Sequence, residues 1–448
     1  MVKHRGIILS KEELKTVLII TYYWPPAGGP GVQRVLKFAK YLPQFGWRPI
    51  ILTVRNGEYP AIDNSLINDI PDNLIVHKTN TLEPSGFYRK FVGMKPGEAI
   101  PVAVLTEKNP SLKKRISNWI RANLFIPDAK IGWIPFAVKK GKKIIKTARP
   151  DIILSSSPPP TVHLIARKLA KWSGIKWVAD FRDPWTNIYH YHNAPKWRLA
   201  KSIDSRMEQK VLTAANSAIT VTEGFFDISP VCATHVLPNG FDPDDYRNIT
   251  PNISAKKQNR SSFTICYMGS LKTRQYVDSF FNSLVNLQRQ YKNTDMQITL
   301  KIIGVVEQSV RGKIQKYEND IRIIFTGYLD HQSALREAAD SDMLVMFIGK
   351  SNIAGRILTG KLFEYLMLKK PILAYGPLNG AAHQILQATN VGMMFDYEDV
   401  FEPQHYIEQL IENRRKNKPV ITINSEEVER YNRVELTKKL AKIFEDLL

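Results

Sequence analysis

A glycine-rich loop near the start of the chain could bind an anion through its backbone. The loop reads Ala27-Gly-Gly-Pro-Gly31 and comes directly before a helical pattern. Glycine lets the backbone approach a ligand closely, and the amides at a helix N-terminus favour negative charge. The spacing is not G-x-G-x-x-G, and no acidic residue ends the next apolar segment, which disfavours a dinucleotide. Phosphate binding by Gly28 and Gly29 and a plain turn without a ligand are the two interpretations.

Two carboxylates flank an arginine later in the first half of the chain. They belong to Asp180-Phe-Arg-Asp183-Pro-Trp185, which begins at the end of an apolar segment. A carboxylate placed there can act as a general base or bind an acceptor hydroxyl, with its neighbours setting its pKa. Either carboxylate could have this role. An ion pair that only shapes the turn is the alternative.

The second half contains two segments that suit phosphate groups. Gly269-Ser-Leu-Lys-Thr-Arg274 follows an apolar segment, and the cations Lys272 and Arg274 could stabilise a diphosphate. Gly360-Lys361-Leu-Phe-Glu364 opens a helix, whose N-terminus can hold a phosphate while Glu364 accepts hydrogen bonds from ribose hydroxyls. A solvated loop at the first segment and simple stabilisation of the helix dipole at the second are the alternatives.

Each of these segments follows a short apolar run, and such runs alternate with helical patterns along the chain. The predicted strands are 16–21, 48–54, 74–77, 151–155, 177–180 and 217–221 in the first half, and 264–268, 298–303, 321–325, 343–347 and 371–375 in the second. Residues 84–135 are expected to form an irregular insertion, and the polar stretch 248–262 to connect the halves. The pattern predicts an α/β fold with two Rossmann-like domains facing across a cleft, which bind ligands outside the carboxyl ends of their strands.

The composition is that of a globular protein and excludes several other classes. The 448 residues, 44% hydrophobic and 23% charged, fit two globular domains and argue against a disordered or fibrous chain. Two cysteines exclude a disulfide scaffold and suit a reducing compartment. No apolar run reaches the roughly 18–20 residues of a membrane-spanning helix, and the charged N-terminus is a poor signal peptide. We expect a soluble, cytoplasmic protein.

The net charge of +21 is unusual and unevenly distributed. The segment Lys108–Arg149 holds 12 Lys or Arg and one acid, Asp128, with aromatic residues such as Trp119 and Trp133 between them. Basic and aromatic residues together favour an anionic membrane surface, and a solvated helix with core aromatics is the alternative. Neither zinc-finger spacing nor an RNA-binding aromatic signature is present, so no nucleic-acid partner is expected.

In their order along the chain, several segments resemble the retaining glycosyltransferases of the GT-B fold, family 4. These segments are YYWPPAGGPGVQRVLKFAKYLPQFGW, IPDAKIGWIPFA, VADFRDPW, VLPNGFD, YMGSLKTRQ and GKLFEYLMLKKPILA. The likeness covers nearly the whole chain. It implies transfer of a sugar from a nucleotide-diphospho-sugar to an acceptor, with no cofactor and no metal.

The resemblance assigns roles to particular residues. It implies that Asp183, Lys272 and Arg274 are catalytic and that the donor is bound by Gly28, Gly29, Gly269, Lys272, Arg274, Tyr328, Gly360, Lys361 and Glu364. It implies an N-terminal acceptor-side domain over 1–247 and a C-terminal donor-binding domain over 248–430. A helix at about 431–448 is expected to pack back on the first domain.

The chain also departs from the family pattern. Family members often show Glu-x7-Glu, whose first Glu contacts the donor sugar, but Arg356 stands eight residues before Glu364. Many members carry a histidine where this chain has Phe181-Arg-Asp183. Arg356 would suit an acidic sugar or face solvent.

The expected partners follow from the resemblance and the charge. They are a nucleotide-sugar donor, a glycan or lipid-linked acceptor of cell-surface polysaccharide synthesis (capsule, lipopolysaccharide or exopolysaccharide), and the anionic inner face of the plasma membrane, bound through Lys108–Arg149. The alternatives are a nucleotide-sugar 2-epimerase of the same architecture and a degenerate, membrane-associated binding scaffold.

Overall fold

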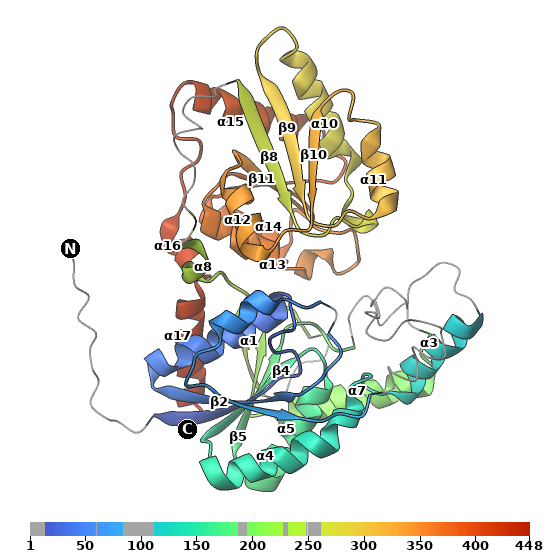
Figure 1. The fold of residues 1–448 in the computed structure, drawn as a ribbon, viewed down its shortest axis with the longest axis vertical. Helices are drawn as coiled ribbons and strands as arrows, with labels where there is room; N and C mark the ends of the chain where they lie inside the picture. Colours follow the sequence, from blue (N-terminus) through green and yellow to red (C-terminus); the bar gives the residue numbers. More distant parts are fainter. Residues whose placement is uncertain are drawn as a thin grey trace, which may run out of the picture. The chain divides into compact units, whose positions relative to one another are not determined.

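The computed structural model describes residues 14–59, 61–83, 112–186, 195–226, 232–247, 249 and 261–448 (Figure 1). Two compact units divide the chain. The first comprises Met1–Val221, Phe225–Leu237 and Thr437–Leu448, and the second comprises Thr222–Gly224 and Pro238–Leu436. The predicted boundary after residue 247 therefore differs by ten residues from the structure. Phe241 and Ile249 explain the difference, because both pack in the core of the second unit.

The first unit is built on a parallel sheet of seven strands in the order β3-β2-β1-β4-β5-β6-β7. Its strands are β1 (Lys15–Ile20), β2 (Trp47–Val54), β3 (Ile75–Thr79), β4 (Ile152–Ser157), β5 (Lys176–Phe181), β6 (Ser217–Thr220) and β7 (Ala233–Val236). Its longer helices are α1 (Pro30–Tyr41), α3 (Leu112–Leu124), α4 (Ile134–Ala148), α5 (Thr161–Ser173) and α7 (Arg198–Ala214), with short helical turns η1 (Leu42–Phe45), η2 (Asn64–Asp69) and η4 (Ile131–Trp133). The strand order reverses between β1 and β4, and ligands bind at such points in open parallel sheets.

The second unit repeats this design with a parallel sheet of six strands in the order β10-β9-β8-β11-β12-β13. Its strands are β8 (Ser262–Met268), β9 (Gln297–Ile303), β10 (Arg322–Gly327), β11 (Met343–Phe347), β12 (Ile372–Tyr375) and β13 (Gly392–Phe395). Its helices are α8 (Pro243–Arg247), α10 (Asp278–Gln290), α11 (Gln308–Gln315), α12 (His331–Ala339), α13 (Gly360–Leu368), α14 (Ala381–Thr389), α15 (Phe401–Arg415) and α16 (Ser425–Glu429), with the turns η5 (Thr273–Gln275) and η6 (Ala354–Arg356). Here the order reverses between β8 and β11.

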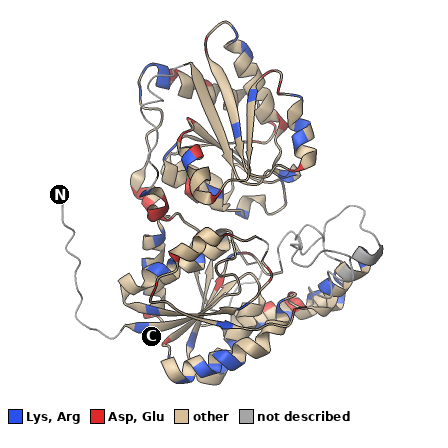
Figure 2. Cartoon of the chain, viewed as in Figure 1, with Lys and Arg blue, Asp and Glu red and all other residues tan. Residues whose placement is uncertain are grey.

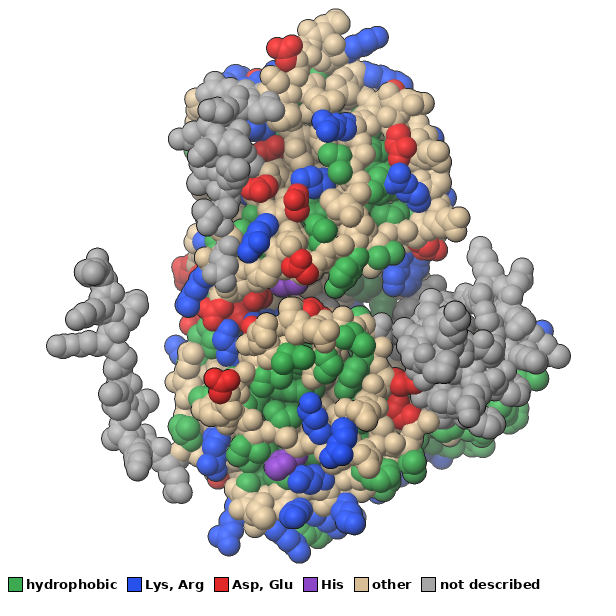
Figure 3. Space-filling view, viewed as in Figure 1, with side chains coloured by type: hydrophobic (Ala, Val, Ile, Leu, Met, Phe, Trp, Pro, Cys, Tyr) green, Lys and Arg blue, Asp and Glu red, His purple; other side chains and the backbone are tan. Residues whose placement is uncertain are grey.

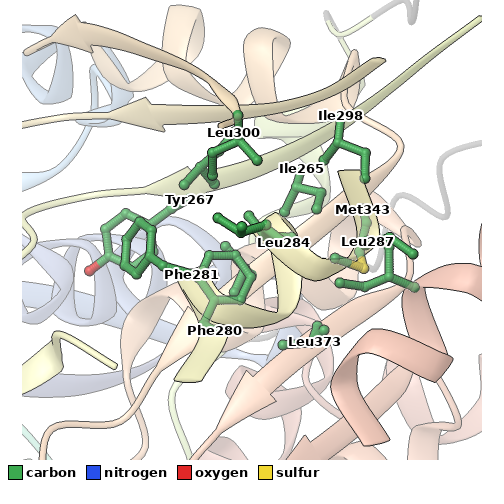
Figure 4. Packing of buried hydrophobic residues seen from close by; sticks show 14 of the residues in the cluster. Ile265, Tyr267, Phe280, Phe281, Leu284, Leu287, Ile298, Leu300, Met343 and Leu373 are labelled. Carbon is green, nitrogen blue, oxygen red and sulfur yellow. The ribbon is translucent and has the colours of Figure 1, made fainter. Parts of the chain in front are cut away.

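Apolar strand faces and amphipathic helices form the cores. In the second unit, Phe280, Phe281 and Leu284 of α10 pack against Ile265 and Tyr267 of β8 (Figure 4). The central strands, such as β4 and β11, are buried on both faces, as expected for a parallel sheet covered by helices on either side, whereas the edge strands β3, β7 and β10 are partly exposed. The last helix, α17 (Arg433–Glu445), ends in the first unit, where the ring of Phe444 lies 5.0 Å from that of Trp47 on β2.

The expectation of an irregular insertion over residues 84–135 is wrong for residues 112–124, whereas residues 125–130 are irregular. Residues 112–124 form α3, because Ile116, Ile120 and Leu124 recur every four residues and neither glycine nor proline interrupts them. Residues 84–111 lie outside the described part of the chain, as does most of the predicted connection 248–262. Within the described residues, no helix has the length and apolar character needed to cross a membrane.

Candidate functional site

Three glycines line the carboxyl edge of the second sheet. Gly269 follows β8, Gly304 follows β9 and Gly327 ends β10, all with positive φ. The Gly269 amide donates to the Ile303 carbonyl at 2.7 Å, and the Gly304 amide donates to the Gly327 carbonyl at 2.7 Å. A Cβ on Gly304 would lie 2.8 Å from the Gly269 carbonyl oxygen, so the close approach of these strand ends requires glycine.

Lys361 lies directly against this edge. A Cβ on Gly269 would come within 2.4 Å of Lys361 Cε, so the lysine occupies the place that a side chain at 269 would take. Lys361 Nζ donates to the Tyr267 hydroxyl at 2.6 Å and lies 4.1 Å from the centre of its ring. Burial lowers the pKa of Lys361 to about 8, Glu364 raises it, and the charge of Lys272 lowers it. In the described part of the chain, no carboxylate forms an ion pair with Lys361.

The predicted cation loop lies beside the same switch point. Leu271 is buried and bridges Val306, which fixes the loop between β8 and α10 against the one after β9. The side chains of Lys272 and Arg274 are exposed. Lys272 acts electrostatically on Lys361, and the Arg274 carbonyl accepts a hydrogen bond from the Lys350 amide after β11 at 3.2 Å. Both cations therefore lie next to the carboxyl ends of β8 and β11.

The N-terminus of helix α13, which carries Lys361, lies at the same carboxyl edge of the second sheet. Thr359 is the N-cap residue, but its side chain forms no capping hydrogen bond and the first turn contains no acid. An uncapped first turn leaves amides for an external acceptor, so Gly360 suits an anion. Arg356 lies in η6, eight residues before Glu364, with its side chain exposed.

Glu364 is held by a partner that the sequence did not indicate. His331 Nε2 lies 3.0 Å from Glu364 Oε1, and both side chains remain 20% exposed. His331 begins α12, whose N-cap residue Asp330 accepts from the Ser333 amide. Because these helices are connected through β11, only the fold shows that they meet. Glu364 is thus oriented and solvent-accessible, as a hydroxyl-binding carboxylate must be.

Tyr328 belongs to the predicted donor-binding set and is largely exposed to solvent. It follows β10, at the outer edge of the sheet, and is 72% exposed. None of the contacts in the described residues joins it to Lys361 or Glu364. Its predicted role remains a prediction.

In the first unit, the glycine-rich loop leads from β1 into α1. The Gly28 amide donates to the Ala61 carbonyl at 3.0 Å, and a Cβ there would lie 3.1 Å from Asp63 Cβ. Gly29 is the N-cap residue of α1 with φ +107°, no side-chain cap follows, and a Cβ on it would meet open space. Gly29 therefore needs glycine for its backbone conformation, and the end of the helix is accessible.

The two carboxylates around Arg182 have different surroundings. Asp180 accepts from Arg34 Nη2 at 2.8 Å, from Arg34 Nε at 3.1 Å and from the Ser156 hydroxyl at 2.6 Å, all buried. Despite burial, which raises the pKa of Asp180, the charge of Arg34 and these hydrogen bonds keep it below its usual value. Asp180 is therefore a structural ion-pair partner of α1, whereas Asp183 is exposed. The prediction that Asp183 is catalytic remains a prediction.

A metal-binding geometry is not present in the described residues: they contain no group of three or more His, Cys, Asp or Glu side chains that could hold an ion.

Comparisons with known proteins agree with the two-sheet design. Residues 98–245 match the family model described as Glycosyltransferase Family 4, and residues 249–427 match the one described as Glycosyl transferases group 1. No curated protein matches the sequence.

Solved structures share the fold over nearly the whole chain. Sucrose-phosphate synthase (tll1590) from Thermosynechococcus elongatus is 13% identical with a TM-score of 0.61, covering 97% of this chain and 99% of its own. Anabaena Alr3699/HepE in complex with UDP-glucose is 13% identical with a TM-score of 0.59, covering 96% and 99%. The apo form of the lipopolysaccharide outer core galactosyltransferase WaaB is 12% identical with a TM-score of 0.56, covering 97% and 100%.

Proposed function

The chain belongs to the glycosyltransferases of the GT-B fold, and we propose that it transfers a sugar from a nucleotide-diphospho-sugar to a glycan or lipid-linked acceptor with retention of the anomeric configuration. The observation that supports this most directly is Lys361. A partly buried ammonium group without a carboxylate partner in the described residues, beside an uncapped helix N-terminus and three glycines, suits a diphosphate.

The proposed chemistry divides between the two units. In the second, Lys361, Lys272 and the first turn of α13 bind the diphosphate and stabilise its charge while the bond from the anomeric carbon to the phosphate oxygen breaks. Arg274 lies at the same strand ends, and Glu364, oriented by His331, accepts a hydrogen bond from the ribose. The acceptor hydroxyl forms the new bond to the anomeric carbon, and its proton passes to the departing phosphate oxygen. In the first unit, Gly28 and Gly29 keep their proposed role in binding the donor phosphates, and Asp183 orients the acceptor hydroxyl.

The proposed acceptor and location rest on the surface of the first unit and on one structural relative. WaaB acts in the lipopolysaccharide outer core, which is a cell-surface polysaccharide. We therefore place the enzyme in the cytoplasm at the inner face of the plasma membrane, in cell-surface polysaccharide synthesis, and assign no metal to the reaction. Turnover that persists in excess EDTA is the expected result, and loss of turnover restored by a divalent cation would contradict it.

An apolar stripe supports the membrane part of the proposal. Ile116, Ile120 and Leu124 of α3 are 45%, 36% and 66% exposed and lie on one face of the helix. Trp197 and Leu199, at the start of α7, are 60% and 67% exposed. The rings of Trp119 and Trp197 are 4.7 Å apart, and the Trp197 amide donates to Asn123 Oδ1, so these two segments form one surface. We call these five exposed side chains the α3–α7 patch.

Basic residues border this patch. Arg115 of α3 and Arg198 and Lys201 of α7 have exposed side chains. Figure 2 shows Lys and Arg along α3, and Figure 3 shows hydrophobic and basic side chains interspersed on the visible face of the first unit. An apolar surface bordered by cations suits an anionic bilayer. The predicted segment Lys108–Arg149 is only partly involved, because Trp133 is fully buried in the core of the first unit.

A thermal-shift screen of the full chain against nucleoside diphosphates and nucleotide-sugars tests the donor assignment. A ligand that binds the folded state raises the apparent melting temperature by mass action, so one nucleotide should stand out. Lys272→Ala with Arg274→Ala should reduce turnover on that donor by orders of magnitude. Lys416→Ala with Lys418→Ala, two exposed cations directly after α15, is the matched control. Near-normal turnover of the first variant would remove the role of the two cations.

A further inference from the structure

Arg182 is a buried cation that the donor site does not use. It follows β5 and is 7% exposed. Its Nε donates to the Ser157 carbonyl at 2.7 Å and its Nη2 donates to the Pro158 carbonyl at 2.9 Å, both at the end of β4. In the described part of the chain, Nη1 makes no hydrogen bond. Two carbonyl contacts fix the plane of the guanidinium group and leave one edge for another acceptor.

That edge lies on the first turn of α1. A Cβ on Gly31 would come within 1.9 Å of Arg182 Nη1 and 2.8 Å of Cζ, so the guanidinium group occupies the space that any other residue at 31 would fill. This turn has Gly29 as its N-cap, no side-chain cap and no acidic residue. The positive end of a twelve-residue helix and an arginine thus meet where the strand order of the first sheet reverses.

Burial lowers the pKa of Arg182, whereas Asp180 and Asp183 act electrostatically on it and raise that pKa. Asp180 forms its ion pair with Arg34 instead, and both of those side chains are 1% exposed. Asp183 is exposed to solvent, which screens its charge. Among the ion pairs of the described residues, none includes Arg182. A buried cation beside a helix N-terminus is costly unless an anion accompanies it.

We infer that Arg182 and the first turn of α1 form a binding site for a phosphate or carboxylate group, and that this group belongs to the acceptor. The inference rests on the proposed function and adds the class of acceptor to it. A planar guanidinium group with a free edge recognises either anion through paired N–H donors. The acceptor would therefore be a phosphorylated or acidic sugar or a sugar linked to a lipid phosphate, which share this anionic group.

Calorimetric titration of the full chain tests the site with small probes. Glucose 6-phosphate and glucuronate supply the two anions, and glucose is the uncharged match. We expect both anions to bind at least ten times more tightly than glucose. Arg182→Gln should lose at least tenfold in affinity for the anions, while Lys168→Gln, an exposed cation on α5, should leave it unchanged. Equal affinity of Arg182→Gln and the unaltered protein for both anions would overturn the inference.

Two further variants show whether a loss of anion binding comes from the site itself or from misfolding. Gly31→Ala keeps the arginine but displaces its guanidinium group, and alanine is a better helix former than glycine. We expect weaker anion binding and a somewhat lower melting temperature, because the displaced guanidinium group loses its hydrogen bonds to the Ser157 and Pro158 carbonyls. Arg182→Lys keeps the charge and should recover part of the affinity. Unchanged anion affinity in a folded Gly31→Ala variant would contradict the site.

The donor nucleotide separates this inference from the proposed function. Affinity for the nucleoside diphosphate found in the thermal-shift screen should change less than twofold in Arg182→Gln. An equal loss for nucleotide and anions would assign Arg182 to the donor phosphates and overturn the acceptor assignment. If no nucleotide binds the unaltered protein, the proposed function fails, but loss of anion binding in Arg182→Gln would still establish the site.

Discussion

The ammonium group of Lys361 lies between a tyrosine hydroxyl, a glycine edge and the first turn of α13. Burial lowers its pKa to about 8, so the group is charged at neutral pH and becomes neutral as the pH rises through that value. A diphosphate needs the charged form. Donor affinity should therefore fall as the pH rises from 7 to 9.

Lys361→Met removes this one charge and tests whether it causes the pH dependence of donor binding. The variant should bind the nucleoside diphosphate about tenfold or more weakly at pH 7, because a charge-assisted hydrogen bond is lost. Its affinity should also vary less than that of the unaltered protein between pH 7 and 9. Titration calorimetry at several pH values measures both effects, with Lys316→Met as a control on the exposed surface of the same unit. A pH dependence that survives in Lys361→Met would assign the titration to another group.

Glu364 leads to a second prediction, which concerns the ribose. If its carboxylate accepts from a ribose hydroxyl, Glu364→Gln should raise the KM for the donor by roughly tenfold and change kcat much less, because the contact is made in ground and transition states alike.

Donors that lack the 2′-hydroxyl or the 3′-hydroxyl of the ribose show which hydroxyl Glu364 binds. The unaltered enzyme should discriminate against the donor that lacks the bound hydroxyl, and Glu364→Gln should discriminate less. Equal discrimination by both enzymes would show that Glu364 acts elsewhere, for example only in holding His331.

The sequence predicts individual helices and strands from the pattern of apolar and polar residues within each segment. Apolar runs predict most strands of both sheets to within a few residues, because strands covered on both faces must be continuously apolar. The predicted strands omit β7 (Ala233–Val236) and β13 (Gly392–Phe395): each spans only four residues, β7 contains polar residues and β13 begins with glycine. The helix α3 was missed because its many charged residues obscured the four-residue repeat.

Side-chain partners were the part that the sequence could not provide. Arg34 and Asp180 are 146 residues apart, and His331 and Glu364 come from different helices. The glycines after strands were predictable as turns, but the contact of Gly31 with Arg182 requires the register of two strands and a helix. Local patterns thus located the candidate site, while pairings between distant residues appear only in the fold.

Helix α5 contains a histidine that should make the fold acid-sensitive. His163 is fully buried, its Nδ1 lies 2.8 Å from the Ser155 hydroxyl, and Trp177 Nε1 donates to the same oxygen. Burial lowers the pKa of His163 to about 3. The unfolded chain binds this proton near pH 6.5 and the folded chain does not, so stability should be lost as the pH falls from about 6.5 towards 3.

His163→Gln should remove this contribution. The free energy of unfolding of the unaltered protein should fall by up to about 1.4 kcal/mol more per pH unit than that of the variant below pH 6. Urea denaturation at pH 7, 6, 5 and 4 gives the two slopes. The variant should be less stable at pH 7, since glutamine fills less of the space beside Phe181. Parallel slopes would show that other groups determine the acid sensitivity.

The whole molecule carries a net charge of +21, and part of the excess lies around the α3–α7 patch. Electrostatic attraction brings such a protein to an anionic surface, and apolar side chains then hold it there. The two contributions respond differently to salt, because screening weakens charge interactions but leaves burial of apolar area largely intact. Flotation of the full chain with vesicles can therefore separate them.

The protein should float with vesicles containing phosphatidylglycerol and remain mostly unbound with pure phosphatidylcholine, and raising the salt from 0.1 to about 0.5 M should reduce recovery severalfold. Ile120→Gln with Leu124→Gln should lower recovery with anionic vesicles at both salt concentrations. Leu378→Gln with Met393→Gln removes comparably exposed apolar side chains from the second unit and should leave recovery unchanged. If both double variants float equally well, the net charge alone attracts the protein, and the α3–α7 patch does not dock to the membrane. Equal, weak recovery with both lipids would remove the membrane from the proposed function while leaving the transfer reaction untouched.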